Sequence, residues 1–282
     1  MKKILITGMN SYVGNRLEKW LERDPDHYLI DKISLRDATW KEKDLSTYDV
    51  VVHVAGIAHQ KETKENAHLY YKINRDLAFE VAKKAKAAEV KQFIFLSSMS
   101  VYGVESGMID ENTPLNPKSH YGKSKLQAEG KINDLAGEKF KVAIVRPPMI
   151  YGKGCKGNYQ RLRKLALKTP IFPNIDNERS MIYIDNLSEF IKNLIEKASN
   201  GLFFPQNKEY VNTTVMVNAI AENHRKQVKL TKMFNPIINL FNDGVIQKVF
   251  GNLVYAETLS DDSKIQCNSF IDFNDSIKLT EE

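Results

Sequence analysis

The sequence is poor in the residues that build disulfide frameworks and metal sites. Its 282 residues include only two cysteines, Cys155 and Cys267, and six histidines. Two cysteines supply neither a disulfide framework nor a zinc site. The histidines are scattered, and no two of them stand at the helical spacing of a pair of metal ligands. We therefore expect no metal.

Long apolar runs are also missing. No stretch approaches the roughly 18 apolar residues of a membrane-spanning helix, so we expect no membrane span. The chain passes from Met-Lys-Lys straight into an apolar run, with no separate signal segment, and we expect a cytoplasmic protein. A hydrophobic content of 42% with 27% charged residues is ordinary for a soluble globular protein. The length suits one two-lobed unit or two small domains.

The charge balance is mildly positive. A net charge of +6 raises the question of nucleic-acid binding. The basic residues are spread along the chain, however, and runs such as Lys83, Lys84 and Lys86 are usually solvated helix faces. Anionic small molecules explain the balance equally well, and we expect no nucleic-acid partner.

The first 21 residues predict a strand, a glycine loop and a helix. Residues 3–7 (KILIT) are apolar, and GMNSYVG follows with Gly8 and Gly14. This order places a phosphate at a helix N-terminus, where free N–H groups and the helix dipole favour an anion. The usual dinucleotide fingerprint has three glycines, and Ser11 stands at the middle position here. The place of the motif between a first strand and a first helix still supports a dinucleotide site.

The residues that follow the second predicted strand, at 31–35, indicate whether the dinucleotide is NAD(H) or NADP(H). In this fold an acidic side chain at that point binds the ribose hydroxyls, whereas an arginine accommodates a 2′-phosphate. Arg36 and Asp37 both stand there, and Arg36 is 22 residues past Gly14, near the expected distance. We favour NADP(H), and Asp37 leaves NAD(H) open.

A third strand is predicted at residues 49–55, where DVVVHVA has the β-branched run of a parallel sheet covered on both faces. It ends in Ala55 and Gly56, small residues that let a cofactor approach the backbone. Asp44 and Leu45 are expected to border the adenine.

Later segments complete the alternation of strands and helices. A helix is predicted over residues 66–89, and its Asn74 either points to the catalytic centre or is simply a polar helix residue. Further strands are predicted at 92–97 and 141–145. The alternation predicts an α/β fold, a Rossmann-type doubly wound parallel sheet whose ligands collect beyond the carboxyl ends of the strands. Ala55, Ser98 and Arg146 all fall at such ends.

Tyr121 and Lys125 are the candidate catalytic residues, together with Ser98. A spacing of four places the tyrosine and the lysine on one face of a helix. An ammonium near a phenol lowers a pKa that is about 10 when unperturbed, so we expect a tyrosine able to exchange protons near neutral pH. Tyr28 and Lys32 share the spacing but lack an upstream strand ending in serines, and we regard that pair as accidental.

The regularity weakens after Gly152. We therefore expect a dinucleotide-binding domain at 1–152, completed by part of 181–205, and a smaller substrate-binding lobe at 153–282. Within the lobe we predict a helix at 158–169, a loop at 170–177, and a short strand at 181–184 before a helix that opens at Asp185. The apolar stretch 233–255 contains Pro236 and Gly244, which favours packing in the lobe over a membrane-surface helix.

In combination, these segments resemble the extended short-chain dehydrogenase/reductase family, the nucleotide-sugar epimerases, dehydratases and reductases. The motifs that carry the resemblance are TGMNSYVG at 7–14, HVAG at 53–56, SSMSVYG at 97–103, YGKSK at 121–125, RPPMIYG at 146–152 and RSMIYIDNL at 179–187. The family implies an NAD(P)-binding Rossmann domain with a C-terminal lobe for a sugar nucleotide. It also implies a Ser-Tyr-Lys catalytic group, which falls on Ser98, Tyr121 and Lys125.

The resemblance also implies individual contacts. Within the motifs, the cofactor would lie against Asn10, Ser11, Tyr12, Val13 and Pro148. Asn158 and Arg179 would contact the UDP pyrophosphate or ribose, and Tyr151 would line the sugar pocket. A guanidinium matches phosphate geometry, which supports Arg179. Asn158 is explained equally well as a helix N-cap.

Within the family, the chain looks most like a reductase. Dehydratases of this family carry an Asp-Glu pair after the catalytic Ser/Thr, where this chain has Met99 and Ser100. The segments VAIVRPPMIYGKGCKGNYQRL and PIFPNIDNERSMIYI resemble bacterial capsular-polysaccharide reductases. These reduce UDP-2-acetamido-2,6-dideoxy-hexos-4-ulose to UDP-N-acetyl-fucosamine or UDP-N-acetyl-quinovosamine, and we predict this NADPH-dependent activity. The alternatives are a UDP-N-acetylhexosamine 4-epimerase with tightly bound NAD and a non-catalytic dinucleotide-binding regulator. A homodimer is expected by analogy only.

Overall fold

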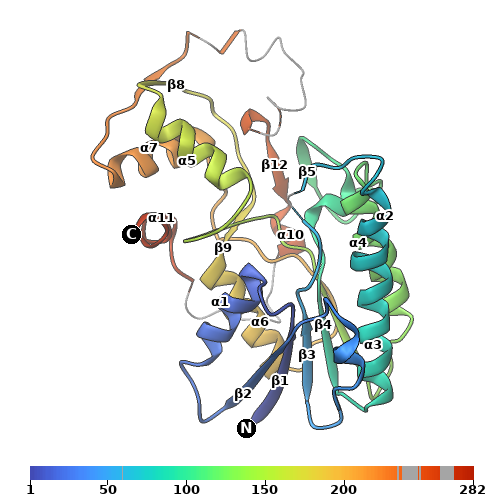
Figure 1. Ribbon diagram of the computed structural model, residues 1–282. Coiled ribbons are helices and arrows are strands. Elements are labelled where there is room, and N and C mark those ends of the chain that lie inside the picture. The colour runs from blue at the N-terminus through green and yellow to red at the C-terminus, as the bar shows by residue number, and fades with distance from the viewer. Residues whose placement is uncertain (59, 234, 237–246, 248, 261–269) are drawn as a thin grey trace.

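A parallel six-stranded sheet forms the centre of the molecule (Figure 1). The computed structural model describes residues 1–58, 60–233, 235–236, 247, 249–260 and 270–282. In spatial order the strands are β10 (Gly201–Phe203), β6 (Lys141–Val145), β4 (Gln92–Leu96), β3 (Val50–His53), β1 (Lys2–Thr7) and β2 (Tyr28–Ile33). All neighbouring strands pair in parallel. The predicted α/β doubly wound fold is therefore confirmed.

Alternate residues of the strands enter two separate hydrophobic cores. Ile4 and Val52 belong to the core on one face, and Leu5 and Phe93 belong to the core on the other. Successive side chains of a strand point to opposite faces, so strands that are apolar throughout require helices on both sides. The sequence pattern thus dictates the layered architecture.

Helices cover both faces of this sheet (Figure 1). On one side α1 (Tyr12–Leu21) packs against α6 (Ile184–Glu196). The other side is covered by α2 (Ala67–Tyr70), the π-helix η2 (Tyr71–Leu77), α3 (Ala78–Ala87) and α4 (His120–Asn133). The segment predicted as one helix at 66–89 is thus helical with a π-helical middle turn, which contains Asn74. Such turns are rare and often mark functional sites.

The second strand differs from its expected position. It spans Tyr28–Ile33 rather than 31–35. It pairs with β1 along the whole of that strand, from Lys2 opposite Tyr28 to Thr7 opposite Ile33. The strand ends at Ile33 because its partner ends at Thr7, where the chain turns at Gly8.

A smaller lobe is built on α5 (Asn158–Lys168), α7 (Thr213–Asn223) and α11 (Phe273–Glu281), with α7 packed against both other helices. Three two-stranded parallel ribbons accompany it: β7 (Met149–Tyr151) with β9 (Met181–Tyr183), β8 (Ile171–Pro173) with β11 (Lys229–Thr231), and β5 (Gly107–Ile109) with β12 (Leu253–Tyr255). The loop predicted at 170–177 therefore contains a strand. Its partner β11 is distant in sequence, so the local pattern gave no sign of it.

Short elements complete the described chain: η1 (Ala38–Lys41), η3 (Met99–Tyr102) and α10 (Glu257–Ser260). Most of the apolar stretch 233–255 and Cys267 lie outside the described residues. At the end of that stretch, Val254 and Tyr255 are buried. Within the described ranges, no helix combines the length and the apolarity needed to cross a membrane.

Candidate functional site

The loop between β1 and α1 lies tightly against the end of β3. Gly8 has a φ of 89°, and a Cβ added there would lie 3.1 Å from the Cα of Ala55. A Cβ on Gly14 would lie 3.1 Å from side-chain atoms of both Ile6 and Val54. Gly8 is therefore favoured by its left-handed backbone and by the approach of the Ala55 backbone, and Gly14 by tight contact with the two side chains. They bring the start of α1 to the carboxyl edge of the sheet.

Ser11 explains why the fingerprint needs no third glycine. It has an extended backbone, with φ −70° and ψ 132°, and is the N-cap of α1. Its hydroxyl accepts a hydrogen bond from the amide of Gly14 at 3.3 Å, and serine is a favoured N-cap. The amides of Tyr12 and Val13 in the first turn have no acceptor within the helix. They are placed to hold a phosphate, so the residues present fit a dinucleotide.

The side chains of this loop take little part in that site. The Tyr12 hydroxyl is buried, and a Cβ on Gly152 would lie 2.8 Å from it. Burial raises the pKa of Tyr12 well above its ordinary value. Asn10 is exposed. Any contact of Tyr12 with the phosphates would therefore be made by its backbone.

Arg36 and Asp37, which follow β2, differ in whether their charged groups have hydrogen-bond partners. Asp37 is the N-cap of η1, and its carboxylate accepts from the amide of Thr39 at 3.1 Å and from the hydroxyl of Thr39. These hydrogen bonds lower the pKa of Asp37. Arg36 is exposed, and no described residue pairs with its guanidinium. The arginine is thus free for a ligand, whereas one carboxylate oxygen of the aspartate is engaged by Thr39.

Asp44 and Leu45, the two residues expected near the adenine, differ in their exposure to solvent. Asp44 is exposed, and its carboxylate accepts from the amide and the hydroxyl of Ser46, both at 2.9 Å. Leu45 is only 3% exposed and belongs to the hydrophobic core beneath α3 and α4.

Asn74 joins the segment after β3 to α4. Its side-chain carbonyl accepts from the amide of Ile57 at 2.7 Å, and its amide donates to the carbonyl of Ile57 at 3.1 Å and the hydroxyl of Ser124 at 3.2 Å. A Cβ on Gly56 would lie 2.9 Å from the Asn74 oxygen and 3.5 Å from the Lys125 ammonium. Asn74 is fully buried, and these contacts make it a positioning residue for the end of β3.

The structure brings Ser98, Tyr121 and Lys125 to one place. Ser98 follows β4 and is the N-cap of η3, with its hydroxyl accepting from the amide of Ser100 at 3.1 Å. Tyr121 and Lys125 stand one turn apart in α4. The Lys125 ammonium donates to the carbonyl of Leu96 at 2.7 Å, so it lies at the end of the same strand that Ser98 follows.

The electrostatics of this group differ from the expectation. Burial raises the pKa of Tyr121, and hydrogen bonding with Ser98 acts in the opposite direction. Burial also lowers the pKa of Lys125 to about 8. The predicted lowering of the tyrosine pKa by the lysine is wrong for this structure. The ammonium is directed at the Leu96 carbonyl and lies 4.6 Å from the centroid of the Phe95 ring instead. Tyr121 is therefore protonated near pH 7 and has a proton to give, but its raised pKa makes it a weaker acid than a free tyrosine.

Two residues outside the predicted set hold the start of α4. The Glu62 carboxylate accepts from the amide of His120 at 2.8 Å and from that of Tyr121 at 2.9 Å. The Ser119 hydroxyl accepts from the amide of Gly122 at 3.0 Å. A carboxylate at a helix N-terminus is stabilising, so Glu62 fixes the turn that carries the candidate catalytic residue Tyr121. Ser119 was identifiable as an N-cap from its place before the helix, whereas no local pattern points to Glu62.

A buried ion pair lies next to the catalytic group. Arg146 and Glu129 form it at 2.6 Å, with side chains only 6% and 5% exposed. The Ser97 hydroxyl donates to Glu129, and Arg146 donates to the hydroxyl of Tyr102 at 2.9 Å. The pair thus joins the ends of β4 and β6 to α4. The Glu129 carboxylate also raises the pKa of Lys125, opposing the effect of burial. Glu129 stands four residues after Lys125, and this helical spacing is the pattern from which their contact could have been predicted.

Tyr151 lies in the interior of the protein, against α11, rather than at an open surface. It is fully buried, and its hydroxyl contacts the Ser276 hydroxyl at 2.6 Å and accepts from Asn207 at 3.0 Å. Pro148 is buried nearby in the chain. In this structure the tyrosine side chain therefore has no exposed surface to offer a sugar.

Arg179 and Asn158 remain candidates for the substrate. The Arg179 guanidinium donates to the carbonyl of Gly251 at 2.7 Å, and no carboxylate among the described residues pairs with it. Burial lowers its pKa. Asn158 is exposed and is the first residue of α5, after the N-cap Gly157. The N-cap interpretation of Asn158 is therefore wrong by one residue.

Comparison with known proteins agrees with this geometry. The sequence matches the NAD dependent epimerase/dehydratase family over residues 4–211. It is 33% identical over 251 residues to a UDP-glucose 4-epimerase of Vibrio cholerae, covering 78% of this chain and 75% of the relative. It is 32% identical over 215 residues to the N-acetyl-alpha-D-glucosaminyl-diphospho-ditrans,octacis-undecaprenol 4-epimerase of Escherichia coli O157:H7, covering 70% of this chain and 64% of the relative.

Solved structures share the whole fold. A UDP-glucuronic acid 4-epimerase from Bacillus cereus in complex with NAD superposes with a TM-score of 0.76 at 19% identity, over 99% of this chain and 97% of that one. A dTDP-4-dehydrorhamnose reductase from Clostridium acetobutylicum gives 0.75 at 20% identity, over 99% and 98%. The chain therefore belongs to the NAD-dependent epimerase/dehydratase family, the extended short-chain dehydrogenases/reductases, and is an NAD(P)-dependent sugar-nucleotide enzyme.

Proposed function

We propose that this enzyme is an NADPH-dependent reductase of the C4 ketone of a UDP-2-acetamido-2,6-dideoxy-hexos-4-ulose. Its product would be UDP-N-acetyl-fucosamine or UDP-N-acetyl-quinovosamine for surface polysaccharide. The observation that carries the proposal is the grouping of Ser98, Tyr121 and Lys125 at the carboxyl end of β4, with the neutral Tyr121 phenol beside Ser98. Reduction of a ketone needs an acid at the oxygen, whereas oxidation of an alcohol needs a base.

In this proposal, bound NADPH supplies the hydride that reduces the ketone. Tyr121 donates its proton to the oxygen on which negative charge develops, and the Ser98 hydroxyl donates a hydrogen bond to the same atom. Lys125, one turn away in α4, is proposed to stabilise the phenolate that Tyr121 leaves behind once its ammonium turns from the Leu96 carbonyl. These donors act where charge appears in the transition state, which is where a hydrogen bond lowers the barrier.

The preference for NADPH is supported by the end of β2. The Arg36 guanidinium is exposed and available for a 2′-phosphate, while one carboxylate oxygen of Asp37 caps η1. Replacing Arg36 with Asp should lower the ratio of kcat/KM for NADPH to that for NADH by at least about tenfold, roughly the loss of one charged contact. Lys19→Asp, on the exposed side of α1, is the matched control. An unchanged ratio in the Arg36 variant would remove the phosphate-binding role.

Arg179 is the proposed contact for the substrate diphosphate. It is a charged group in a buried setting whose observed acceptors are carbonyl oxygens, which leave its charge unneutralised. A diphosphate would supply the missing negative charge with matching geometry. Asn158 is exposed at the start of α5 and is proposed as a second contact.

A 4-epimerase is the second candidate, favoured by the two curated relatives at 33% and 32% identity. It predicts NAD that copurifies with the protein and interconversion of N-acetylhexosamines without net consumption of reductant. A non-catalytic regulator is disfavoured, because it needs no Ser-Tyr-Lys group.

The test is to mix the protein with NADPH and UDP-4-keto-6-deoxy-N-acetylglucosamine, made in place by a 4,6-dehydratase, and to follow NADPH absorbance. Consumption that requires both the protein and the keto-sugar supports the reductase, and NMR of the product gives the C4 configuration. No consumption with NADPH or NADH, together with interconversion of UDP-N-acetylhexosamines, would replace this proposal by the epimerase.

A further inference from the structure

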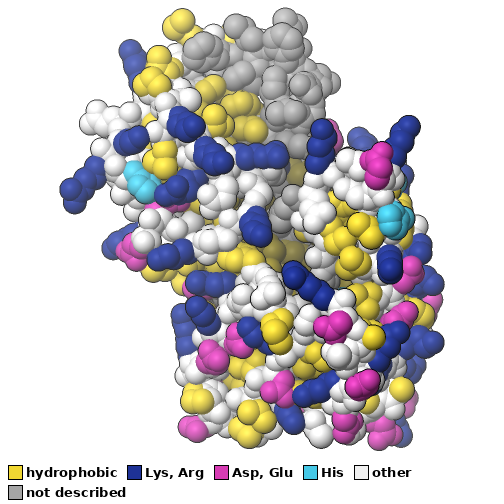
Figure 2. All heavy atoms as spheres, in the orientation of Figure 1, with side chains coloured by type: hydrophobic (Ala, Val, Ile, Leu, Met, Phe, Trp, Pro, Cys, Tyr) yellow, Lys and Arg dark blue, Asp and Glu magenta, His cyan; other side chains and the backbone are white. Residues whose placement is uncertain are grey.

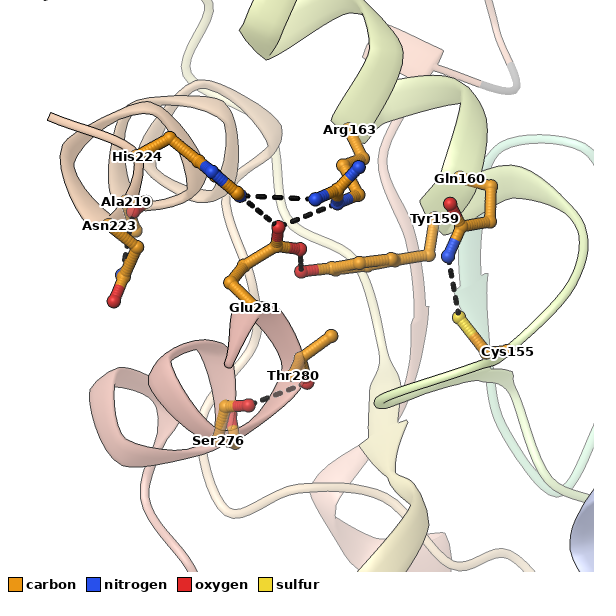
Figure 3. A network of polar contacts seen from close by, with 10 residues as sticks. All are labelled: Cys155, Tyr159, Gln160, Arg163, Ala219, Asn223, His224, Ser276, Thr280 and Glu281. Carbon is orange, nitrogen blue, oxygen red and sulfur yellow. Dashed lines mark hydrogen bonds and ion pairs between the residues drawn. The ribbon is translucent and has the colours of Figure 1, made fainter. Parts of the chain in front are cut away.

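The solvent side of α5 is basic with an exposed leucine. Four exposed residues repeat at helical spacing along one side, opposite the buried Tyr159, Leu162 and Ala166: Arg161, Lys164, Leu165 and Lys168. The helix has one further cation, Arg163, which turns inward and pairs with Glu281 at 2.6 Å (Figure 3). The outward cations have no such partner among the described residues.

The chain passes directly from α5 into the ribbon of β8 and β11. Ile171 begins β8 three residues after Lys168 and is 46% exposed. Lys229 stands opposite Ile171 in the parallel register, so the two side chains share one face of the ribbon. Met233, two residues past the end of β11, is 79% exposed. We define the tip surface by six residues: Lys164, Leu165, Lys168, Ile171, Lys229 and Met233.

The charge of this region is of one sign. Neither residues 161–172 nor residues 224–236 contain an aspartate or glutamate. Figure 2 shows Lys and Arg side chains gathered over the lobe that carries α5, whereas the sheet domain below it mixes both signs. A surface of one sign attracts an extended partner of the opposite sign.

We propose that the tip surface docks the protein on an anionic lipid bilayer. The lysines would lie among the anionic headgroups, and Leu165, Ile171 and Met233 would enter the boundary between headgroups and acyl chains. A basic surface that also exposes large apolar side chains is the pattern of interfacial membrane binding. Nucleic acid would account for the lysines but not for the three apolar residues among them. The proposal does not depend on which reaction the enzyme catalyses.

Vesicle flotation tests the proposal with the full chain. Wild-type protein should float with vesicles of phosphatidylcholine and phosphatidylglycerol, should not float with phosphatidylcholine alone, and should be released by salt. The variant Lys164→Glu/Lys168→Glu/Lys229→Glu should bind on the order of 100-fold more weakly, because each basic residue near the surface contributes. The matched control is Lys19→Glu/Lys83→Glu/Lys139→Glu, which makes the same charge change at exposed positions of the sheet domain and should retain most of the binding.

A second variant tests the apolar contribution separately. Ile171→Ser/Met233→Ser keeps every charge and should weaken binding to the anionic vesicles by roughly tenfold or more. Circular dichroism and turnover of the sugar substrate report whether each variant is folded. Absence of flotation, or equal flotation of the tip-lysine variant and the wild type, would overturn the proposal. So would affinity for duplex DNA that the lysine variant loses and the Ile171/Met233 variant keeps.

Discussion

The sheet domain and the lobe each bury a carboxylate, and they satisfy it in different ways. In the sheet domain, Glu129 pairs with Arg146, and both side chains are almost fully enclosed. In the lobe, Glu281 is 2% exposed, but its partners Arg163 and His224 are 33% and 29% exposed (Figure 3). Water can therefore reach Arg163 and His224 if Glu281 is removed, whereas the enclosed Arg146 guanidinium would keep only the Tyr102 hydroxyl without Glu129.

The difference matches what each network does. The Glu129 pair holds the strand ends and the helix that carry the catalytic group, and it acts on Lys125. The Glu281 network attaches the C-terminal helix α11 to α5 and to the end of α7. Burial alone would raise the pKa of Glu281, but hydrogen bonds from Tyr159, His224 and Arg163 hold that pKa below its ordinary value. The first network is enclosed on all sides, and the second is open to water through Arg163 and His224.

The largest expected effect comes from breaking the enclosed pair. Glu129→Ala leaves a buried and uncompensated guanidinium, and should lower the free energy of unfolding by about 3–5 kcal/mol. Urea denaturation measures this. The double variant Glu129→Leu/Arg146→Met is the control, because it removes both charges and should recover much of the loss. A single variant as stable as the wild type would show that the pair is not the fixed element described here.

Tyr121→Phe should separate chemistry from stability in the same domain. It removes the proton donor while keeping the ring, so turnover should fall at least 100-fold, about 2.7 kcal/mol in barrier. The melting temperature and the dissociation constant for NADPH should stay near their wild-type values. Steady-state kinetics and fluorescence titration measure the two. Near-normal turnover would exclude Tyr121 as the acid.

The lobe network should be more tolerant. Glu281→Ala should lower the free energy of unfolding by about 1–3 kcal/mol. The loss is limited because the charged partner Arg163 and the partner His224 can be hydrated once the carboxylate is gone. The comparison with Glu129→Ala is made in one set of urea titrations. A loss as large as that of Glu129→Ala would contradict the distinction between an enclosed and a surface-linked carboxylate.

The smallest effect is expected at the start of α4. Glu62→Gln removes a negative charge from the helix N-terminus and should cost about 1 kcal/mol of stability. Because the amide it caps belongs to Tyr121, kcat should fall several-fold while KM for the cofactor stays the same. Ser119→Ala, which removes the other cap of the same turn, is the matched control for a purely structural loss. Parallel changes in kcat and KM would contradict a positioning role for Glu62.

Local patterns predicted most of the sheet domain and parts of the rest, because the helix predicted at 158–169 and the strand predicted at 181–184 appear as α5 and β9. The strands were identifiable because alternate residues of apolar runs face two cores, and Ser98 and Arg146 were found because strand ends carry ligands in this fold. Ser11 departs from the three-glycine fingerprint, and its role as the N-cap of α1 depends on backbone geometry that the residue type alone does not reveal. The contact of Glu62 with α4 and the pairing of β8 with β11 were not predictable, because both join segments far apart in sequence.

We propose that Tyr121 acts as an acid in a net reduction. The direct measurement is transfer of deuterium from NADPH labelled at C4 of the nicotinamide to UDP-4-keto-6-deoxy-N-acetylglucosamine, read by mass spectrometry and NMR of the sugar. If Tyr121 is the acid of a net reduction, one deuterium should appear at C4 of the sugar for each NADPH consumed. The rate of deuterium transfer should be at least about 100-fold lower in Tyr121→Phe. An unlabelled sugar whose C4 configuration is nevertheless inverted, with no NADPH consumed, would contradict it.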